Sequence, residues 1–297
     1  MGRAVWAGHK PLNATLLVAL ALGLGACRKE AEAPSQPSAA AQQASPQPME
    51  EGAPTTVDQP EAPELKDTFE SSASYIFGVS YAPGINQYPV LARHVWNYVQ
   101  AARKDTEVAA GDGPQAGAGN APHELSLTFS QVIKTPDLVV IAADGNRYTG
   151  GAHGEPLVER YVWLPKQDRL LDAASLIPDA AGWQAVSVAA RESLRTAVSL
   201  RADAESLPPE QREQMVRQAG KMIDEGTEPD PANFTRFVPV LDANGKVTAL
   251  RFVFPPYQVG PYAEGTQQVE VPAAVLLPHV APDYRGLFTG GAPAVAN

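Results

Sequence analysis

The sequence is poor in cysteine, in basic residues and in long apolar runs. It contains a single cysteine, Cys27, so no disulfide can form within the chain. Its apolar run at residues 14–24 is well below the roughly 20 residues that a transmembrane helix requires. Lys and Arg number 23 against 33 Asp and Glu, which gives a formal net charge of −10. Such a chain lacks the basic patch that binding to phosphates requires, so no nucleic-acid partner is predicted.

Sequence motifs of several enzyme classes are also missing. His123–Glu124 has no second histidine four residues later, which excludes the zinc-protease helix motif. No Gly-x-Ser-x-Gly segment is present to place a nucleophilic serine, and Gly245–Lys246 lacks the upstream glycine of a phosphate-binding loop. The acidic residues of segment 224–230 lack the alternating layout of a calcium loop. Because these motifs are absent, the sequence predicts no catalytic residue, no cofactor and no metal site.

The N-terminus has the three parts of a secretory signal: basic residues such as Lys10, the apolar run, and small residues before Cys27. The segment Leu-Gly-Ala-Cys at 24–27 resembles the lipobox of bacterial lipoproteins. The resemblance implies cleavage before Cys27 and attachment of fatty-acyl lipid to its sulfur, which anchors the chain to a membrane. Arg28 follows the cysteine in place of Asp. By resemblance to Gram-negative sorting, this favours the outer membrane, with the domain facing the periplasm.

The rest of the chain divides by composition. Residues 28–65 are rich in Pro, Ala, Gln, Ser and Glu and nearly empty of large apolar residues, so we expect a disordered tether. Residues 66–288 have the length of one domain or of two intimate subdomains. Within them, the Gly- and Ala-rich segment 109–121 is predicted to be a loop. Residues 289–297 are expected to be a flexible tail.

Hydrophobic periodicity predicts an α+β fold for this domain. Apolar residues recur with helical spacing over 88–99 and after the N-cap residue Asp179, and a third helix is predicted to start near Pro208-Pro209-Glu210 and to end by Gly226. Asn244–Gly245 indicates a tight hairpin between the last two predicted strands. The order of elements favours an antiparallel sheet packed against about three helices. The predicted strands are residues 72–80, 123–132, 138–143, 158–164, 234–241 and 247–254.

Two segments stand out as candidate binding sites. The first, Tyr-Thr-Gly-Gly-Ala-His-Gly at 148–154, places His153 beside Gly150 and Gly151, where glycine permits tight turns or close approach of another chain. The second, FVFPPYQVGPYAEG at 252–265, holds Tyr257 and Tyr262 among prolines that restrict the backbone. Rigid aromatic residues suit an interface. A structural turn and a lid over the core are the alternative interpretations.

Together these two segments resemble the extracytoplasmic domain of the lysozyme-binding RsiV-type anti-sigma factors. The same module accompanies some polysaccharide deacetylases of the PdaC type and occurs alone in many Gram-negative lipoproteins. The match lies in the Gly-Gly-Ala-His turn at 150–153 and in 252–265, and the resemblance extends over about residues 67–280. It implies an α+β fold with antiparallel sheet on helices. The anti-sigma segment, its transmembrane helix and the deacetylase catalytic domain have no counterpart here, so only the recognition module is expected.

The leading hypothesis is thus a non-enzymatic envelope lipoprotein of a domain family of unknown function. Its domain would bind a cationic, lysozyme-like protein or peptidoglycan through His153, Gly150, Gly151, Tyr257 and Tyr262. The alternative is an enzyme, or an enzyme accessory, acting on peptidoglycan or another envelope polysaccharide. That alternative would require His153 to lie beside an acid such as Asp137 or Asp144 in a pocket. A third hypothesis is a structural envelope protein without a ligand.

Overall fold

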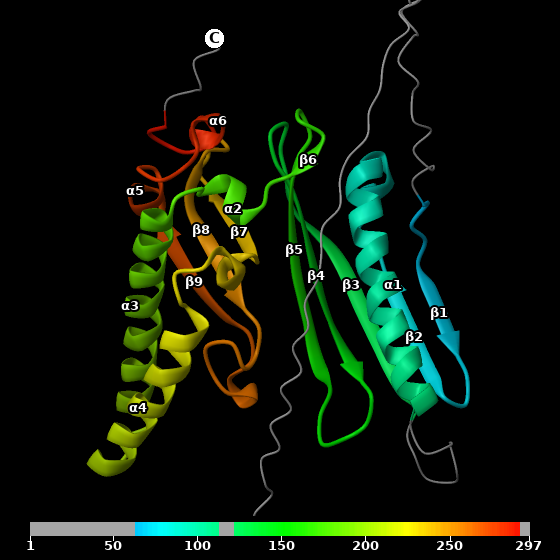
Figure 1. The fold of residues 1–297 in the computed structure, drawn as a ribbon, viewed down its shortest axis with the longest axis horizontal. Helices are drawn as coiled ribbons and strands as arrows, with labels where there is room; N and C mark the ends of the chain where they lie inside the picture. Colours follow the sequence, from blue (N-terminus) through cyan, green and yellow to red (C-terminus); the bar gives the residue numbers. More distant parts are fainter. Residues whose placement is uncertain (1–62, 113–121, 292–297) are drawn as a thin grey trace, which may run out of the picture. The chain divides into compact units, whose positions relative to one another are not determined.

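The computed structural model describes residues 63–112 and 122–291, all within one compact unit. Cys27, the leader, nearly all of the predicted tether, and residues 292–297 of the predicted tail lie outside the described residues. Two β-sheets and three long helices make up the fold, so the predicted α+β class is confirmed (Figure 1). No helix among the described residues is both long enough and apolar enough to span a bilayer.

The larger sheet has six strands arranged in chain order. Every neighbouring pair is antiparallel except β2 and β3, which pair in parallel. A parallel pair needs a long crossover. Helix α1 (Pro89–Asp112) provides it, so the sheet is mixed where a wholly antiparallel one was predicted, and α1 extends into the predicted loop at 109–121. The strands are β1 (Thr68–Ser71), β2 (Tyr75–Ser80), β3 (His123–Lys134), β4 (Val139–Tyr148), β5 (Glu155–Leu164) and β6 (Arg169–Leu170).

The smaller sheet has three antiparallel strands, β7 (Phe237–Leu241), β8 (Val247–Phe254) and β9 (Gln267–Pro272). The predicted hairpin joins β7 to β8: Gly245 has a φ of +76°, and the Asp242 carboxylate accepts from the backbone N–H of Asn244 at 2.8 Å. Positive φ at this position is the reason for glycine.

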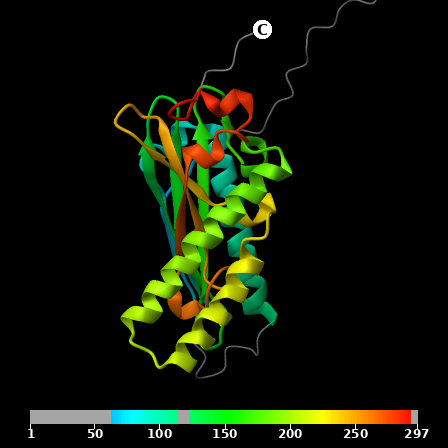
Figure 2. The same cartoon turned by 90° about the vertical axis from the view of Figure 1, so that its left-hand side faces the viewer.

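Helices α3 (Ala180–Ala204) and α4 (Pro209–Gly226) run side by side against the smaller sheet (Figure 2). The Asp179 carboxylate accepts from the Gly182 N–H at 2.6 Å, which confirms the predicted N-cap. Short helical segments complete the fold: η1 (Ile85–Gln87), α2 (Ala173–Leu176), η2 (Pro231–Phe234), η3 (Tyr262–Glu264), α5 (Ala273–Leu276) and α6 (Pro282–Arg285).

Two hydrophobic cores share strands β4 and β5. Val139 and Trp163 belong to the core beneath α1, whereas Val140 and Val162 belong to the core that includes α3 and the smaller sheet. Successive side chains of a strand point to opposite faces of the sheet. The uninterrupted apolar run at 138–143 therefore reflects a strand that is buried on both faces. The N-terminal end of β5 lies close to the C-terminal end of β8 in this arrangement.

Candidate functional site

The glycine-rich segment is the turn between β4 and β5. Gly150 and Gly151 have φ of +102° and +98°, which side-chain-bearing residues rarely adopt. No atom lies within 4 Å of where a Cβ would stand at either residue, so conformation, and not lack of space, requires glycine there. Gly154 differs, because its Cβ would lie 2.3 Å from the side chain of Asn146. The turn leaves His153 exposed to solvent.

The second segment begins where β8 ends. Phe252 and Phe254 are buried in the core, while Tyr257 is 55% exposed. Tyr257 has a φ of +73°, and its N–H donates to the Gly260 carbonyl at 2.9 Å, which closes a tight turn. A tyrosine at positive φ is strained, and such strain persists only where surrounding contacts hold it.

Gln258 supplies those contacts, and sequence reasoning missed it. Its side-chain amide donates to the carbonyls of Gly226 at 3.0 Å and Asn233 at 2.8 Å. A Cβ on Gly226 would stand 1.9 Å from the Gln258 carbonyl oxygen, so the two segments approach as closely as glycine allows. The loop that carries Tyr257 is therefore docked on the C-terminal end of α4.

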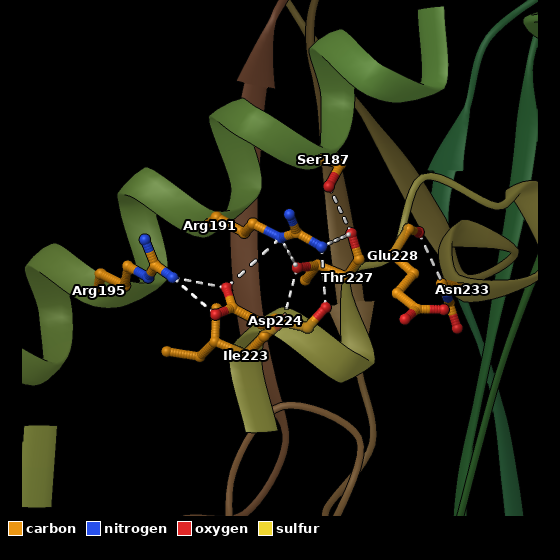
Figure 3. A network of polar contacts seen from close by, with 8 residues as sticks. All are labelled: Ser187, Arg191, Arg195, Ile223, Asp224, Thr227, Glu228 and Asn233. Atoms are coloured by element: carbon orange, nitrogen blue, oxygen red, sulfur yellow. Dashed lines mark hydrogen bonds and ion pairs between the residues drawn. The ribbon is translucent and has the colours of Figure 1, made fainter. Parts of the chain in front are cut away.

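The end of α4 is itself fixed to α3 by a polar network (Figure 3). Arg191 donates to the Asp224 carbonyl at 2.9 Å and to the Thr227 hydroxyl at 3.0 Å, and Ser187 donates to the Thr227 carbonyl at 2.5 Å. Arg195 forms an ion pair with the Asp224 carboxylate at 2.6 Å. These donors satisfy carbonyls that a helix end leaves unpaired. The network also engages the acidic segment 224–230, and the described residues contain no cluster suited to a metal ion.

The two segments meet at three rings, although 104 residues separate His153 from Tyr257. The Tyr257 hydroxyl lies 3.0 Å from His153 Nε2, and the His153 ring stacks on Tyr262 with centroids 4.0 Å apart. The other ring nitrogen, Nδ1, lies 3.3 Å from the Gly154 carbonyl. A carbonyl can only accept, so the neutral ring carries its proton on Nδ1 and accepts from Tyr257 at Nε2. Gly150 and Gly151, with their positive φ, form the bend of the turn that carries His153.

The carboxylates that the enzyme alternative requires are engaged elsewhere. Asp137 pairs with Lys166 at 2.5 Å, and Asp144 pairs with Arg160 at 2.9 Å. Within the part of the chain that the structure describes, no carboxylate lies within hydrogen-bonding distance of His153. The geometry therefore gives this histidine no acid–base partner of the kind that a hydrolytic site uses.

A groove of about 470 Å³ opens beside the rings. Its walls combine aromatic, proline and aliphatic side chains with few charges. Tyr98 of α1 and Arg236, just before β7, line it, and neither was singled out from the sequence. Burial and, next, the nearby Glu159 carboxylate raise the pKa of Tyr98 to about 12. The apolar part of the lining comes from Pro156, Leu157, Val158, Pro255, Pro256 and the ring of Tyr257.

Comparison with known proteins connects the chain to a family without an assigned function. Residues 197–274 match a family model described as "Protein of unknown function (DUF3298)". That segment contains Tyr257 and Tyr262, but it begins after the glycine turn and does not include it. No curated protein sequence matches the chain.

Solved structures with similarity to this chain include two members of that family. One is a DUF3298 family protein from Pseudomonas aeruginosa PAO1, with 17% identity and a TM-score of 0.48, covering 78% of this chain and 99% of that one. The other is a member of the DUF3298 family from Bacteroides fragilis NCTC 9343, with 17% identity and a TM-score of 0.41, covering 74% and 93%.

Proposed function

We propose that this chain is an envelope lipoprotein whose folded domain binds a protein partner through His153, Tyr257 and Tyr262. The observation that carries the proposal is the meeting of the three rings on an exposed surface. Two segments far apart in the sequence converge to present them, and Tyr257 is held at positive φ. Exposed aromatic side chains that are already ordered lose little entropy on binding, so they are effective contact residues.

The expected partner is a cationic protein. The full chain carries a net charge of −10, and an acidic surface attracts basic proteins and speeds their association. The resemblance to lysozyme-binding domains adds a specific candidate, a lysozyme-like hydrolase. Cell-wall glycan is the alternative ligand, because sugars also pack on exposed rings, and the binding experiment separates the two.

The membrane anchor is proposed from the lipobox at residues 24–27. Acylation of Cys27 and cleavage before it would leave the domain on a tether at residues 28–65, with Arg28 favouring the outer membrane. Intact mass spectrometry of protein purified from its native host tests this. The expected species begins at Cys27 and carries the added mass of its acyl chains. A free thiol at Cys27 or a retained leader would contradict the anchor without touching the binding proposal.

Calorimetric titration of the full chain with lysozyme tests the binding proposal. We expect the double variant His153→Ala with Tyr257→Ala to weaken binding by about 30-fold or more, as two central contact residues would. Phe69→Ala is the matched control, since Phe69 is an aromatic on β1 that is 76% exposed and outside the site. It should bind as the unaltered chain does.

Two results would revise the proposal. Lysozyme binding that survives the double variant would remove these rings from the interface. Binding of soluble peptidoglycan fragments, but not of lysozyme, with the same sensitivity to the double variant would assign the site to glycan.

A further inference from the structure

The groove beside the rings contains two hydrogen-bond donors that the fold does not use. Arg236 has five N–H donors, and only Nε is engaged, by the Val158 carbonyl at 2.6 Å. Its nearest approach to the Glu159 carboxylate is also from Nε, at 3.7 Å, which is beyond hydrogen-bonding distance. Within the described residues, the two terminal nitrogens of Arg236 therefore form no hydrogen bond, and they belong to a side chain that lines the groove.

The second donor is the hydroxyl of Tyr98. The ring is fixed by edge contacts with Phe129, at 6.4 Å between centroids, and with Tyr161, at 6.5 Å. Its hydroxyl makes no hydrogen bond to another described residue, although Tyr98 lines the groove. Because its pKa is raised, the hydroxyl keeps its proton at any physiological pH and remains a donor. Tyr98 and Arg236 line the same groove, so both donors face one ligand-sized space.

The backbone along the groove does not compete for the same ligand. Alternate residues of a strand direct their N–H and C=O groups to opposite sides. The Val162 carbonyl accepts from Leu171 and the Val158 carbonyl from Arg236, so the even-numbered residues of β5 face away from β4. On that edge Pro156 has no N–H, and the Arg160 N–H is occupied by the Glu159 side chain at 2.9 Å.

Such features protect a strand edge from pairing with another chain. With the carbonyl of one edge residue taken, the N–H of another taken and a proline at the entrance, an added strand would find few backbone partners. Recognition in this groove must therefore come from side chains, namely the Arg236 guanidinium and the Tyr98 hydroxyl.

We propose that this groove is a carboxylate-binding site, in which the Arg236 fork and the Tyr98 hydroxyl hold the carboxylate of a polypeptide while the proline and aromatic walls receive its adjoining apolar atoms. A planar guanidinium matches a carboxylate through two parallel N–H bonds. The Arg236 side chain is oriented in advance by its bond to Val158, which lowers the entropy lost on binding. This inference deepens the proposed function, on which it rests for the source of the carboxylate, since it names the group that a partner would place beside the three rings.

The acidic residue in the lining of the groove, Glu155, is compatible with an anionic ligand because a cation already engages it. Glu155 pairs with Arg147, and Arg147 also pairs with Asp105 on α1. Glu159 is not in this lining: its carboxylate accepts from the backbone N–H of Arg160 and lies 3.7 Å from Nε of Arg236. A carboxylate in the groove would therefore face the terminal N–H groups of Arg236 and the Tyr98 hydroxyl, with the charge of Glu155 already offset by Arg147.

Saturation-transfer NMR titration of the full chain in detergent micelles tests the site with small probes. N-acetyl-leucyl-alanine presents an apolar side chain and a free C-terminal carboxylate, and its C-terminal amide is the matched control. We expect the acid to bind saturably and the amide at least about tenfold more weakly, since a hydrogen-bonded charge pair is lost. An N-acetyl-alanyl-glutamyl amide separates the sources: preference for it over the acid would assign the site to an acidic side chain in place of a chain terminus.

Three variants locate the binding. Tyr98→Phe removes only a hydroxyl that makes no hydrogen bond to another described residue, so the variant should fold normally and bind the acid about tenfold more weakly. Arg236→Lys keeps the charge but loses the fork, and Arg236→Gln loses both, so affinity should fall in that order. Phe69→Ala should leave the acid unaffected.

Equal binding of acid and amide, absence of saturable binding by both carboxylate probes, or full affinity in Tyr98→Phe and Arg236→Gln would overturn this inference. Its failure is distinguishable from that of the proposed function. Lysozyme binding that depends on His153 and Tyr257 in a protein that ignores carboxylates would reject only the carboxylate site. Carboxylate binding in a protein that binds neither lysozyme nor glycan would reject only the partner.

Discussion

The two loops that meet at the candidate site are held in very different ways. The loop after β8 is docked on α4: Gln258 bonds the Gly226 carbonyl, and Glu264 forms an ion pair with α3 at 2.7 Å. At the apex of the glycine turn between β4 and β5, Gly150 and Gly151 have no atom within 4 Å of a would-be Cβ, and the Gly151 carbonyl accepts from the Tyr148 hydroxyl of the same turn at 3.2 Å. One side of the site is therefore fixed by tertiary contacts and the other mainly by its own backbone.

This difference indicates how the site can be both selective and adaptable. A docked loop presents Tyr257 and Tyr262 in one arrangement, so binding costs little ordering of these side chains. We expect the glycine turn to open more easily than the docked loop, because local opening is easiest where few contacts are lost. A partner would thus meet a preset surface on one side and an adjustable one on the other.

The strongest test of the docked loop is Gly226→Ala. The added methyl group would stand 1.9 Å from the Gln258 carbonyl oxygen, so either α4 or the loop must shift. We expect a loss of about 3 kcal/mol in the free energy of unfolding, measured by urea denaturation, because overpacked backbone contacts relax poorly.

Gly220→Ala is its control in the same helix. Gly220 has no atom within 4 Å of its would-be Cβ, so alanine should stabilise α4 by up to about 1 kcal/mol through helix propensity. Equal effects of the two substitutions would show that the loop is not docked on α4 through Gly226.

Gln258→Leu sharpens the comparison at lower cost. It keeps similar volume but leaves the carbonyls of Gly226 and Asn233 without their side-chain donor. Loss of the donor to two part-buried acceptors should cost about 2 kcal/mol in unfolding free energy. The exposed Gln268→Leu on β9 serves as control and should change stability by less than about 0.5 kcal/mol. An equally small effect of Gln258→Leu would mean that other contacts position Tyr257.

Much of this fold follows from local sequence signals, and the exceptions have physical causes. The Asp179 cap, the Asn244–Gly245 hairpin and the bounds of α4 were predictable because each depends on residues within a few positions. The predicted strand 72–80 was wrong at its start. There, the Ser72 hydroxyl accepts from the Tyr75 N–H at 3.1 Å, which creates a turn between β1 and β2. Strand β9 was missed although Val269 and Val271 alternate inward, since polar residues surround them.

The three rings of the candidate site were singled out from the sequence, but their contact with one another was not predicted. His153, Tyr257 and Tyr262 stood out because glycine and proline surround them. Their meeting depends on the β4–β5 register and on the Gly226–Gln258 contact, which no local pattern encodes. Tyr98 resembles any aromatic on an amphipathic helix, and Arg236 any charge before a strand. Their place in the groove follows from the way α1, β5 and the loop after β8 come together.

The strain at Tyr257 gives a smaller and more specific prediction. Because its φ is +73°, Tyr257→Gly should be more stable than Tyr257→Ala by about 0.5–1 kcal/mol, since glycine tolerates that conformation. Both variants lose the same ring and the same bond to His153, so the difference isolates the backbone. Thermal unfolding of the two proteins side by side measures it. If alanine proves the more stable, the loop has relaxed to negative φ, and the fixed side of the comparison is less rigid than its contacts indicate.

The smallest effect on stability is expected at the opposite side, in His153→Ala. The ring is exposed, and its contacts with Tyr257 and Gly154 face solvent, where hydrogen bonds contribute little net free energy. We expect the free energy of unfolding to change by less than about 0.5 kcal/mol. In the unaltered chain and in the variant alike, amides of residues 149–154 should exchange with deuterium faster than those of residues 255–262. Loss of lysozyme binding with unchanged stability would place His153 at the interface and not in the scaffold. A loss of stability above about 1 kcal/mol, or protection of the glycine turn equal to that of the docked loop, would mean that both sides of the site are rigid.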